Sequence, residues 1–246
     1  MTITILDRVI SSIKKDRPVR EVRIGPFWTA VQTDRAGLAS TTFVHEHEIR
    51  FPVEDVGMLT EKSGLELCEY SKSESLLEAS VGVATINSML DVESLNFTEI
   101  NASEVLFEKG AGKRVAIVGH FPFVADLRKV AKELWVIERR PQTGDLSEEA
   151  AERVIPKADV VAITGTALIN GTIGRLLELC PKNSIVMVLG PSTPLSTVWF
   201  DYGVDLISGT IVTDPELMLR FVSEGIVFKQ LRGRGVSLVT MSKNNM

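Results

Sequence analysis

The sequence predicts an α/β protein in which a small α+β domain precedes a Rossmann-like, doubly wound parallel sheet. Three observations support this fold class. Apolar runs of strand length alternate with helical segments through the second half, the first half has strands of alternating polarity followed by helices, and the two styles change near Gly110-Ala-Gly112. The 246 residues are enough for one large domain or two small ones. We expect two, over residues 1–109 and 110–246.

The first half is expected to begin with a helix over about residues 3–16. Residues 19–24 alternate apolar and charged side chains, as a half-buried strand does. After Gly25-Pro26, residues 27–33 resume a β-rich composition, which is typical of a hairpin. A third extended segment around residues 41–49 would complete an antiparallel meander.

A helix rich in small residues follows the meander. Ser75-Leu-Leu-Glu78 fits a capping box, and Ser71-Lys-Ser-Glu74 fits one as well, so the start of the helix is open by one turn. A glycine inside a helix costs about 1 kcal/mol relative to alanine, so Gly82 predicts that another element approaches closely there. Asn87, late in this helix, is either an ordinary helix-end residue or an amide that projects into a cleft between the domains.

The second half repeats strand and helix regularly. Its apolar runs are continuous, which is typical of strands buried on both faces of a parallel sheet. The expected strands cover residues 114–118, 134–137, 160–164, 185–189 and 204–207, and the expected helices cover about 123–132, 147–155, 172–179, 195–201 and 215–224. Right-handed crossovers between such strands produce an open, doubly wound sheet.

Ligands of such sheets bind outside the carboxyl ends of the strands. Four of the five expected strands are followed there by a glycine, and these are Gly119, Gly165, Gly190 and Gly209. Glycine lets backbone amides approach a ligand, although a single glycine of this kind often serves turn geometry alone. Four together on one edge predict a binding cleft.

Glu138 follows the second strand, 19 residues beyond Gly119. A carboxylate about 20 residues after the first turn binds ribose hydroxyls in dinucleotide-binding folds. However, Gly119-His-Phe-Pro122 departs from the GxGxxG fingerprint and disfavours NAD, because its bulky side chains and its proline oppose a pyrophosphate. A nucleoside-type ligand such as S-adenosylmethionine stays open, as does a surface pairing of Glu138 with Arg139 or Arg140.

His120 lies at the same edge, where an imidazole suits general acid–base catalysis near neutral pH. Its alternative role is to stack with Phe121 as a wall of the cleft. Polar side chains on the neighbouring turns would hold a polar ligand, or would only cap helices: Thr166, Asn170, Ser192 and Thr193. Ser192 is outside any GxSxG elbow, so a hydrolase triad is unsupported.

His45-Glu-His-Glu48 is the candidate metal-binding segment of the sequence. On a strand, His45 and His47 share one face and can bind one metal, provided that a third ligand comes from elsewhere. Neither of the two cysteines, Cys68 and Cys180, has a neighbour in sequence that completes such a set. An exposed, charged edge strand explains the segment more simply.

Composition limits the partners. The net charge of −5 and the pI near 5.4 argue against a broad basic face for nucleic acid or anionic lipid. The amino terminus lacks the pattern of a signal peptide, and no apolar stretch approaches the roughly 20 residues of a membrane helix. We therefore expect a cytoplasmic protein with reduced thiols and a small-molecule partner, and a homo-oligomer is compatible with the sequence.

Four segments resemble motifs of the "putative heavy-metal chelation" family: Ile24-Gly-Pro-Phe-Trp-Thr-Ala-Val31, Gly119-His-Phe-Pro-Phe123, Thr164-Gly-Thr-Ala-Leu-Ile-Asn-Gly-Thr172 and Gly190-Pro-Ser-Thr-Pro-Leu195. The resemblance extends along nearly the whole chain. It implies an enolase-N-terminal-like domain joined to a Rossmann-like domain, with an active site between them. It also implies condensation or hydrolysis of precursors of flavins, pterins or metal-chelating compounds.

Together, these observations favour an enzyme that acts on a polar heterocyclic or siderophore-like metabolite, with His120 as acid and base. Two other functions stay open. One is a methyltransferase-like enzyme that binds S-adenosylmethionine against Glu138. The other is a non-enzymatic protein that binds a metal or a metallophore through His45, His47 and His120.

Overall fold

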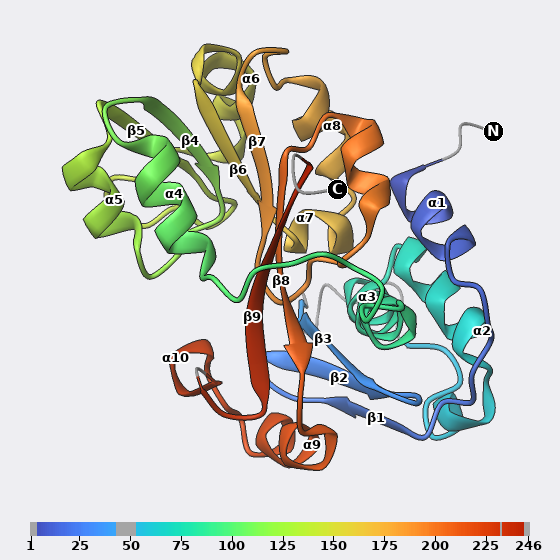
Figure 1. The fold of residues 1–246 in the computed structure, drawn as a ribbon. Helices are drawn as coiled ribbons and strands as arrows, with labels where there is room; N and C mark the ends of the chain where they lie inside the picture. The colour runs from blue at the N-terminus through green and yellow to red at the C-terminus, as the bar shows by residue number, and fades with distance from the viewer. Residues whose placement is uncertain (1–3, 43–52, 232, 244–246) are drawn as a thin grey trace.

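The computed structural model describes residues 4–42, 53–231 and 233–243, and within them the chain forms two sheets flanked by helices (Figure 1). The first sheet is antiparallel, with strands β1 (Glu21–Ile24), β2 (Trp28–Gln32) and β3 (Ala36–Ser40) in that order. The second has the order β5-β4-β6-β7-β8-β9, in which β9 alone is antiparallel to its neighbour. The predicted combination of an antiparallel meander and a doubly wound parallel sheet is confirmed.

The first two strands match the predicted hairpin, but the third lies earlier than expected. A tight turn follows β2, in which the Thr33 N–H donates to the Arg35 carbonyl at 2.7 Å, so the chain reverses at once into β3. The third strand of the meander was therefore predicted too late in the chain, around residues 41–49. Residues 43–49 of that prediction lie outside the described part of the chain. The sequence signal of β3 is weak because Ala-Gly-Leu-Ala-Ser contains few strand-forming residues.

Short helices precede the long helix of the first half. The predicted opening helix is α1 (Ile5–Ser11), which ends sooner than expected. After the first sheet come the 3₁₀ turn η2 (Leu59–Glu61), α2 (Gly64–Glu69), the 3₁₀ turn η3 (Tyr70–Lys72) and the long helix α3 (Leu76–Met89). Ser75 caps α3 and accepts a hydrogen bond from the Glu78 N–H at 3.4 Å, so the predicted start at Ser75 is correct. Ser71 lies in η3 instead.

The predicted close approach at Gly82 is confirmed. A Cβ atom added to Gly82 would lie 1.9 Å from the backbone nitrogen of Ser71. The turn η3 therefore packs directly on the backbone of α3, at a distance that only glycine permits.

The second half builds the larger sheet from β4 (Arg114–Val118), β5 (Glu133–Ile137), β6 (Val160–Thr164), β7 (Ile185–Leu189), β8 (Leu206–Val212) and β9 (Val236–Ser242). The first four agree with the predicted strands to within one residue. Its helices are α4 (Ala102–Gly110), α5 (Val124–Val130), α6 (Ala151–Val154), α7 (Thr166–Ile169), α8 (Ile173–Glu178), α9 (Pro215–Ser223) and α10 (Phe228–Leu231), with 3₁₀ turns η4 (Glu148–Ala150), η5 (Ile155–Lys157) and η6 (Thr197–Tyr202). The parallel strands run in the order β5-β4-β6-β7-β8, so the strand order reverses between β4 and β6.

The two halves share one packed interior. Successive residues of β2 point to opposite faces of the first sheet, and residues 28–31 are all buried because both faces are covered. Val31 packs in the core that contains α3, whereas Trp28 and Ala30 pack with Met218 and Val222 of α9. In Figure 1, α3 and α9 lie on opposite sides of this sheet. The division at residues 109 and 110 stays a prediction, and α4 packs beside β4 and α5 of the second half.

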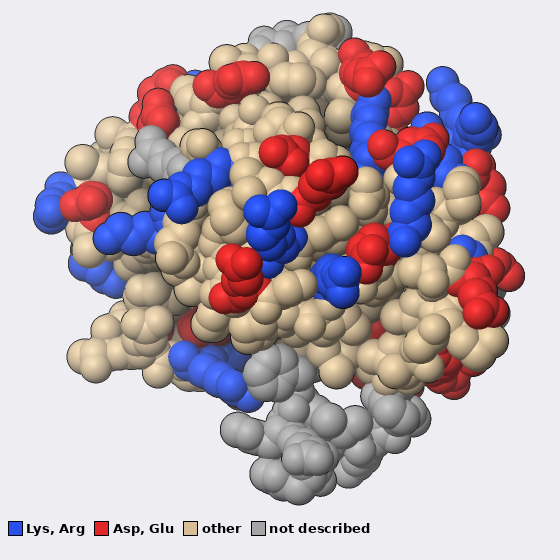
Figure 2. Space-filling view, turned by 90° about the horizontal axis from the view of Figure 1, so that it is seen from below, with Lys and Arg blue, Asp and Glu red and all other residues tan. Residues whose placement is uncertain are grey.

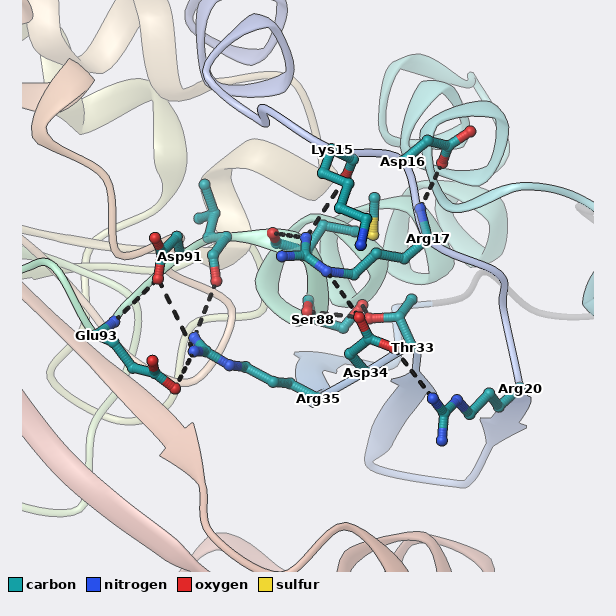
Figure 3. Close-up of polar contacts among 12 residues, drawn as sticks. Lys15, Asp16, Arg17, Arg20, Thr33, Asp34, Arg35, Ser88, Asp91 and Glu93 are labelled. Atoms are coloured by element: carbon teal, nitrogen blue, oxygen red, sulfur yellow. Dashed lines mark hydrogen bonds and ion pairs between the residues drawn. The ribbon is translucent and has the colours of Figure 1, made fainter.

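An arginine cluster fixes the carboxyl end of α3 (Figure 3). Arg17 donates to the Met89 carbonyl at 2.9 Å, and Arg35 donates to the Leu90 carbonyl at 3.3 Å. Asp34 in turn pairs with Arg17 at 3.1 Å. Cations beside the last carbonyls of a helix satisfy them and complement the helix dipole. This anchors the end of α3 that carries Asn87.

Charged side chains of both signs are interspersed on the face seen from below in Figure 2. That face therefore presents no large area of one sign. Within the described ranges, none of the helices has the length and apolar character needed to cross a membrane.

Candidate functional site

A cleft of about 1440 Å³ lies at the carboxyl ends of β4, β6 and β7, where the strand order reverses. Both halves of the chain line it. The first half contributes Trp28, Ser40, Thr41, Thr42 and Leu76, and the second half contributes α4's first turn, the turns after β4 to β7, and the start of α10. Crevices at such a reversal are where open α/β sheets bind their ligands.

His120 lies in this cleft and is held by a buried carboxylate. Its Nδ1 lies 2.8 Å from Oδ2 of Asp145, whose side chain is only 1% exposed, while the imidazole itself is 28% exposed. Because a carboxylate accepts a hydrogen bond from Nδ1–H, the lone pair of the neutral ring resides on Nε2. The pair has the arrangement of an oriented general base.

Glu138 also lines the cleft, but its carboxylate is engaged by the backbone. Oε2 accepts the His120 N–H at 2.9 Å, and Oε1 accepts the Arg139 N–H at 2.8 Å. The side chain therefore joins the end of β5 to the turn after β4 and positions His120. Oε1 also accepts the Arg140 N–H at 3.5 Å, so Oε2 is the oxygen that keeps a second lone pair for a ligand. The predicted role of Glu138 as an acceptor stays a prediction.

Phe121 forms the floor of the cleft between two glycine turns. Gly119 and Gly190 line the cleft with φ values of 101° and 108°, in the region that favours glycine. A Cβ atom at Gly119 would lie 3.3 Å from the Phe121 ring, and one at Gly190 would lie 3.9 Å from it. Phe121 also stacks on Phe123, with ring centroids 5.2 Å apart. The His120 ring contacts Asp145, and the Phe121 ring stacks on that of Phe123.

Three of the predicted polar residues line the cleft and already have partners within the protein. The Thr166 hydroxyl accepts from that of Thr164 at 3.1 Å. Oδ1 of Asn170 accepts from the Thr172 hydroxyl at 2.6 Å, at the start of α8. The Ser192 hydroxyl accepts the Ser40 N–H at 2.8 Å, which joins the two halves.

Of the predicted ligand-binding residues that the structure describes, four do not line the cleft, namely Asn87, Gly165, Thr193 and Gly209. Asn87 donates from Nδ2 to the Leu38 carbonyl at 2.8 Å and to the Pro191 carbonyl at 3.3 Å, and so bridges the two halves behind the wall. Gly165 packs closely on Thr193. A Cβ atom added to Gly165 would lie 2.5 Å from the Thr193 hydroxyl oxygen.

The expected turn at Gly209 is wrong in position. Gly209 lies inside β8 and pairs with Val239 of β9, a strand that the sequence did not predict. Pairing along the whole of β9 extends β8 beyond its apolar run. A Cβ there would lie 3.0 Å from the Thr193 carbonyl oxygen, a tight contact that favours glycine.

A metal site held by the protein needs three or four donor side chains that converge. Within the described residues, no three His, Cys, Asp or Glu side chains lie close enough together to hold a metal ion. Burial raises the pKa of both cysteine thiols, Cys68 and Cys180, to about 12, which disfavours the thiolate that a metal binds. His45 and His47 lie outside the described residues. The described residues thus do not fit a metal held by protein side chains.

Sequence reasoning missed Asp145 and Trp28. Asp145 lies in an irregular loop between β5 and η4, where its N–H donates to the Gln142 carbonyl at 3.0 Å. Nothing in the sequence links Asp145 to His120. Trp28 was assigned to the predicted hairpin, and in the structure it lines the cleft beside Phe228 of α10, with ring centroids 6.3 Å apart. The sequence shows only that one residue is an acid and the other an indole. It does not show which residue either of them contacts.

Comparisons with known proteins agree with this architecture. Residues 101–241 match the DUF364 family model and residues 6–90 match the DUF4213 model, and both are described as "Putative heavy-metal chelation". An uncharacterized protein of Methanocaldococcus jannaschii is 31% identical over 176 residues, which cover 67% of each chain.

Two crystal structures have the same fold. A DUF364 protein of unknown function from Desulfitobacterium hafniense superposes with a TM-score of 0.85 at 27% identity, over 97% of this chain and 98% of that one. Another from Pyrococcus horikoshii gives a TM-score of 0.77 at 21% identity, with the same coverage. The chain therefore belongs to the DUF364 family, the family described as "Putative heavy-metal chelation".

Proposed function

We propose that this protein is an enzyme that uses His120 as general acid and base on a small molecule bound in the cleft. The observation that carries the proposal is the 2.8 Å contact between Nδ1 of His120 and the buried carboxylate of Asp145. This contact orients the ring and stabilises the imidazolium once Nε2 has taken a proton. A cleft that contains an oriented base at the switch point is a favoured place for catalysis.

The lining supports a polar, partly planar substrate. The stacked rings of Phe121 and Phe123 offer an apolar floor, and hydroxyl and amide groups surround it. A flavin-like, pterin-like or siderophore-like metabolite combines these properties, and the family description favours one that chelates metal. We propose that the metal arrives with this metabolite, because the described side chains offer no three-ligand set.

Hydrolysis or condensation is the reaction that such a base can serve. In hydrolysis, Nε2 of His120 takes a proton from the attacking water, and the imidazolium returns a proton to the leaving atom. Condensation is the reverse sequence. Asp145 keeps its negative charge throughout and holds the ring.

The test compares wild type with His120→Ala in a mixture of small metabolites from cell extract, followed by mass spectrometry. We expect a metabolite that wild type consumes and His120→Ala does not, although both bind it. Asp126→Asn is the matched control, because Asp126 is a carboxylate of the cleft that pairs with Lys129 at 2.6 Å, away from the histidine. Equal consumption by wild type and His120→Ala removes His120 from the mechanism. A metabolite that is bound but never consumed supports a non-enzymatic carrier instead.

A further inference from the structure

Trp28 has a buried hydrogen-bond donor that no described residue accepts. The side chain lines the cleft and is 9% exposed, yet its indole Nε1 has no hydrogen-bond partner among residues 4–42, 53–231 and 233–243. By contrast, the buried indole of Trp199 donates to the Pro194 carbonyl at 2.9 Å. An unsatisfied buried donor costs free energy that an acceptor atom of a ligand would recover.

The first turn of α4 lines the same cleft and offers further donors. Asn101 caps this nine-residue helix, its Oδ1 accepting the Ser103 N–H at 3.1 Å and its carbonyl accepting the Glu104 N–H at 3.0 Å. The Ala102 N–H has no acceptor within the described part of the chain, as expected for a first-turn amide. The positive end of the helix dipole adds to its attraction for an anion.

Lys229 supplies a full positive charge to the same cleft. It lines the cleft next to Phe228, whose ring centroid lies 6.3 Å from that of Trp28, and it forms no ion pair with any described residue. Three of the five described carboxylates that line the cleft form ion pairs with other residues. Asp126 pairs with Lys129, Glu148 with Arg139 and Glu152 with Arg175.

We infer that the ligand carries an oxyanion group, a carboxylate or a phosphate, which binds at the end of the cleft formed by Trp28, the first turn of α4 and Lys229. The inference rests on the proposed function, since it assigns the charge of that ligand. The anion accepts hydrogen bonds from the indole Nε1–H and the Ala102 N–H and pairs with the ammonium group of Lys229. Because Nε1 is buried, the anion reaches it only with a local shift of the side chains around the indole.

The test uses inorganic phosphate and the indole N–H signals of a ¹⁵N-labelled protein. The chain has three tryptophans, so three such signals are expected, and Trp28→Phe identifies the one from Trp28 by its loss. Phosphate should shift the Trp28 signal in a saturable manner and leave that of Trp199 in place. A parallel titration with acetate, at constant ionic strength maintained with chloride, distinguishes a phosphate ligand from a carboxylate ligand.

Three variants make the result specific. Lys229→Met should weaken phosphate binding about tenfold, as expected for a charged hydrogen bond. Lys182→Met, at an exposed lysine that does not line the cleft, should leave binding unchanged. Ala102→Pro removes one N–H at a helix position that tolerates proline and should weaken binding about two- to fivefold.

The inference is overturned if the Trp28 signal does not respond to either anion, or if Lys229→Met and Lys182→Met bind phosphate equally well. His120→Ala should bind phosphate like wild type. If phosphate binds at Trp28 but His120→Ala consumes the metabolite as wild type does, the proposed function fails and the anion site stands. If His120→Ala loses turnover but phosphate does not bind at Trp28, the anion site fails and the proposed function stands.

Discussion

Replacing Gly82 by alanine tests how tightly η3 packs on α3. The added Cβ would lie 1.9 Å from the Ser71 nitrogen and 2.6 Å from the Tyr70 carbonyl carbon. Both neighbours are backbone atoms, so no side-chain rotation relieves the overlap, and the two elements must separate. Overpacking of this kind costs about 3 kcal/mol at the upper end of its usual range.

The substitution also has a favourable effect that must be subtracted. Alanine favours the interior of a helix over glycine by about 1 kcal/mol, which leaves a net loss of about 2 kcal/mol. For a chain of this length, we expect the Tm to fall by about 4–8 °C in thermal unfolding followed by circular dichroism.

Gly174→Ala is the matched control within another helix. An added Cβ at Gly174 in α8 meets no atom within 4 Å, so the restriction of the unfolded chain should stabilise the protein by about 0.4–1 kcal/mol. Its Tm should rise. A Gly82→Ala protein as stable as wild type, or as stable as Gly174→Ala, would show that the contact between η3 and α3 is not close.

Three further outcomes are expected. Asp145→Asn should lower turnover of the cleft's substrate about 10²-fold or more, with little change in Tm, because an amide no longer stabilises the imidazolium. The Arg114 guanidinium holds the pKa of the Asp159 carboxyl below its ordinary 3.8, so their pair stabilises the fold above that pH and the contribution is lost as the pH falls further. In urea unfolding at a series of acid pH values, Asp159→Asn should therefore lose part of the pH dependence of wild type. Cys68 and Cys180, whose pKa burial raises to about 12, should react slowly with iodoacetamide at about pH 8 and quickly after unfolding in urea.

The repeating part of the fold could be predicted because its strands are buried on both faces. A continuous apolar run such as Val160–Thr164 has the same pattern wherever it lies in a parallel sheet, so its limits follow from composition. β9 could not be predicted in the same way, since Val-Ser-Leu-Val-Thr-Met-Ser is partly polar and its pairing with β8 depends on distant residues. The error at Gly209 has the same cause, because the partner strand decides where β8 ends.

The candidate site was only partly predictable, for a related reason. Strand order places the turns after β4 and β6 side by side, which brings His120 and Thr166 into one cleft from local patterns alone. The partner of His120 is set by the path of an irregular loop, which no periodicity describes. Nor does the sequence say which polar groups the protein uses internally, as it does with the Asn87 side-chain N–H groups, which bond to the Leu38 and Pro191 carbonyls.

The shared interior explains how a cleft between two halves can hold a fixed geometry. Trp28 and Leu38 of the first sheet pack in one cluster with Met218 and Val236 of the second half, so the first sheet has a buried face only when α9 covers it. On its other face lies α3, whose Asn87 reaches across to the Pro191 carbonyl. Movement of one half against the other would expose the cluster and break this bridge. The spacing between Trp28 and His120 is therefore set by the same contacts that stabilise the fold, and the cleft is formed before any ligand binds.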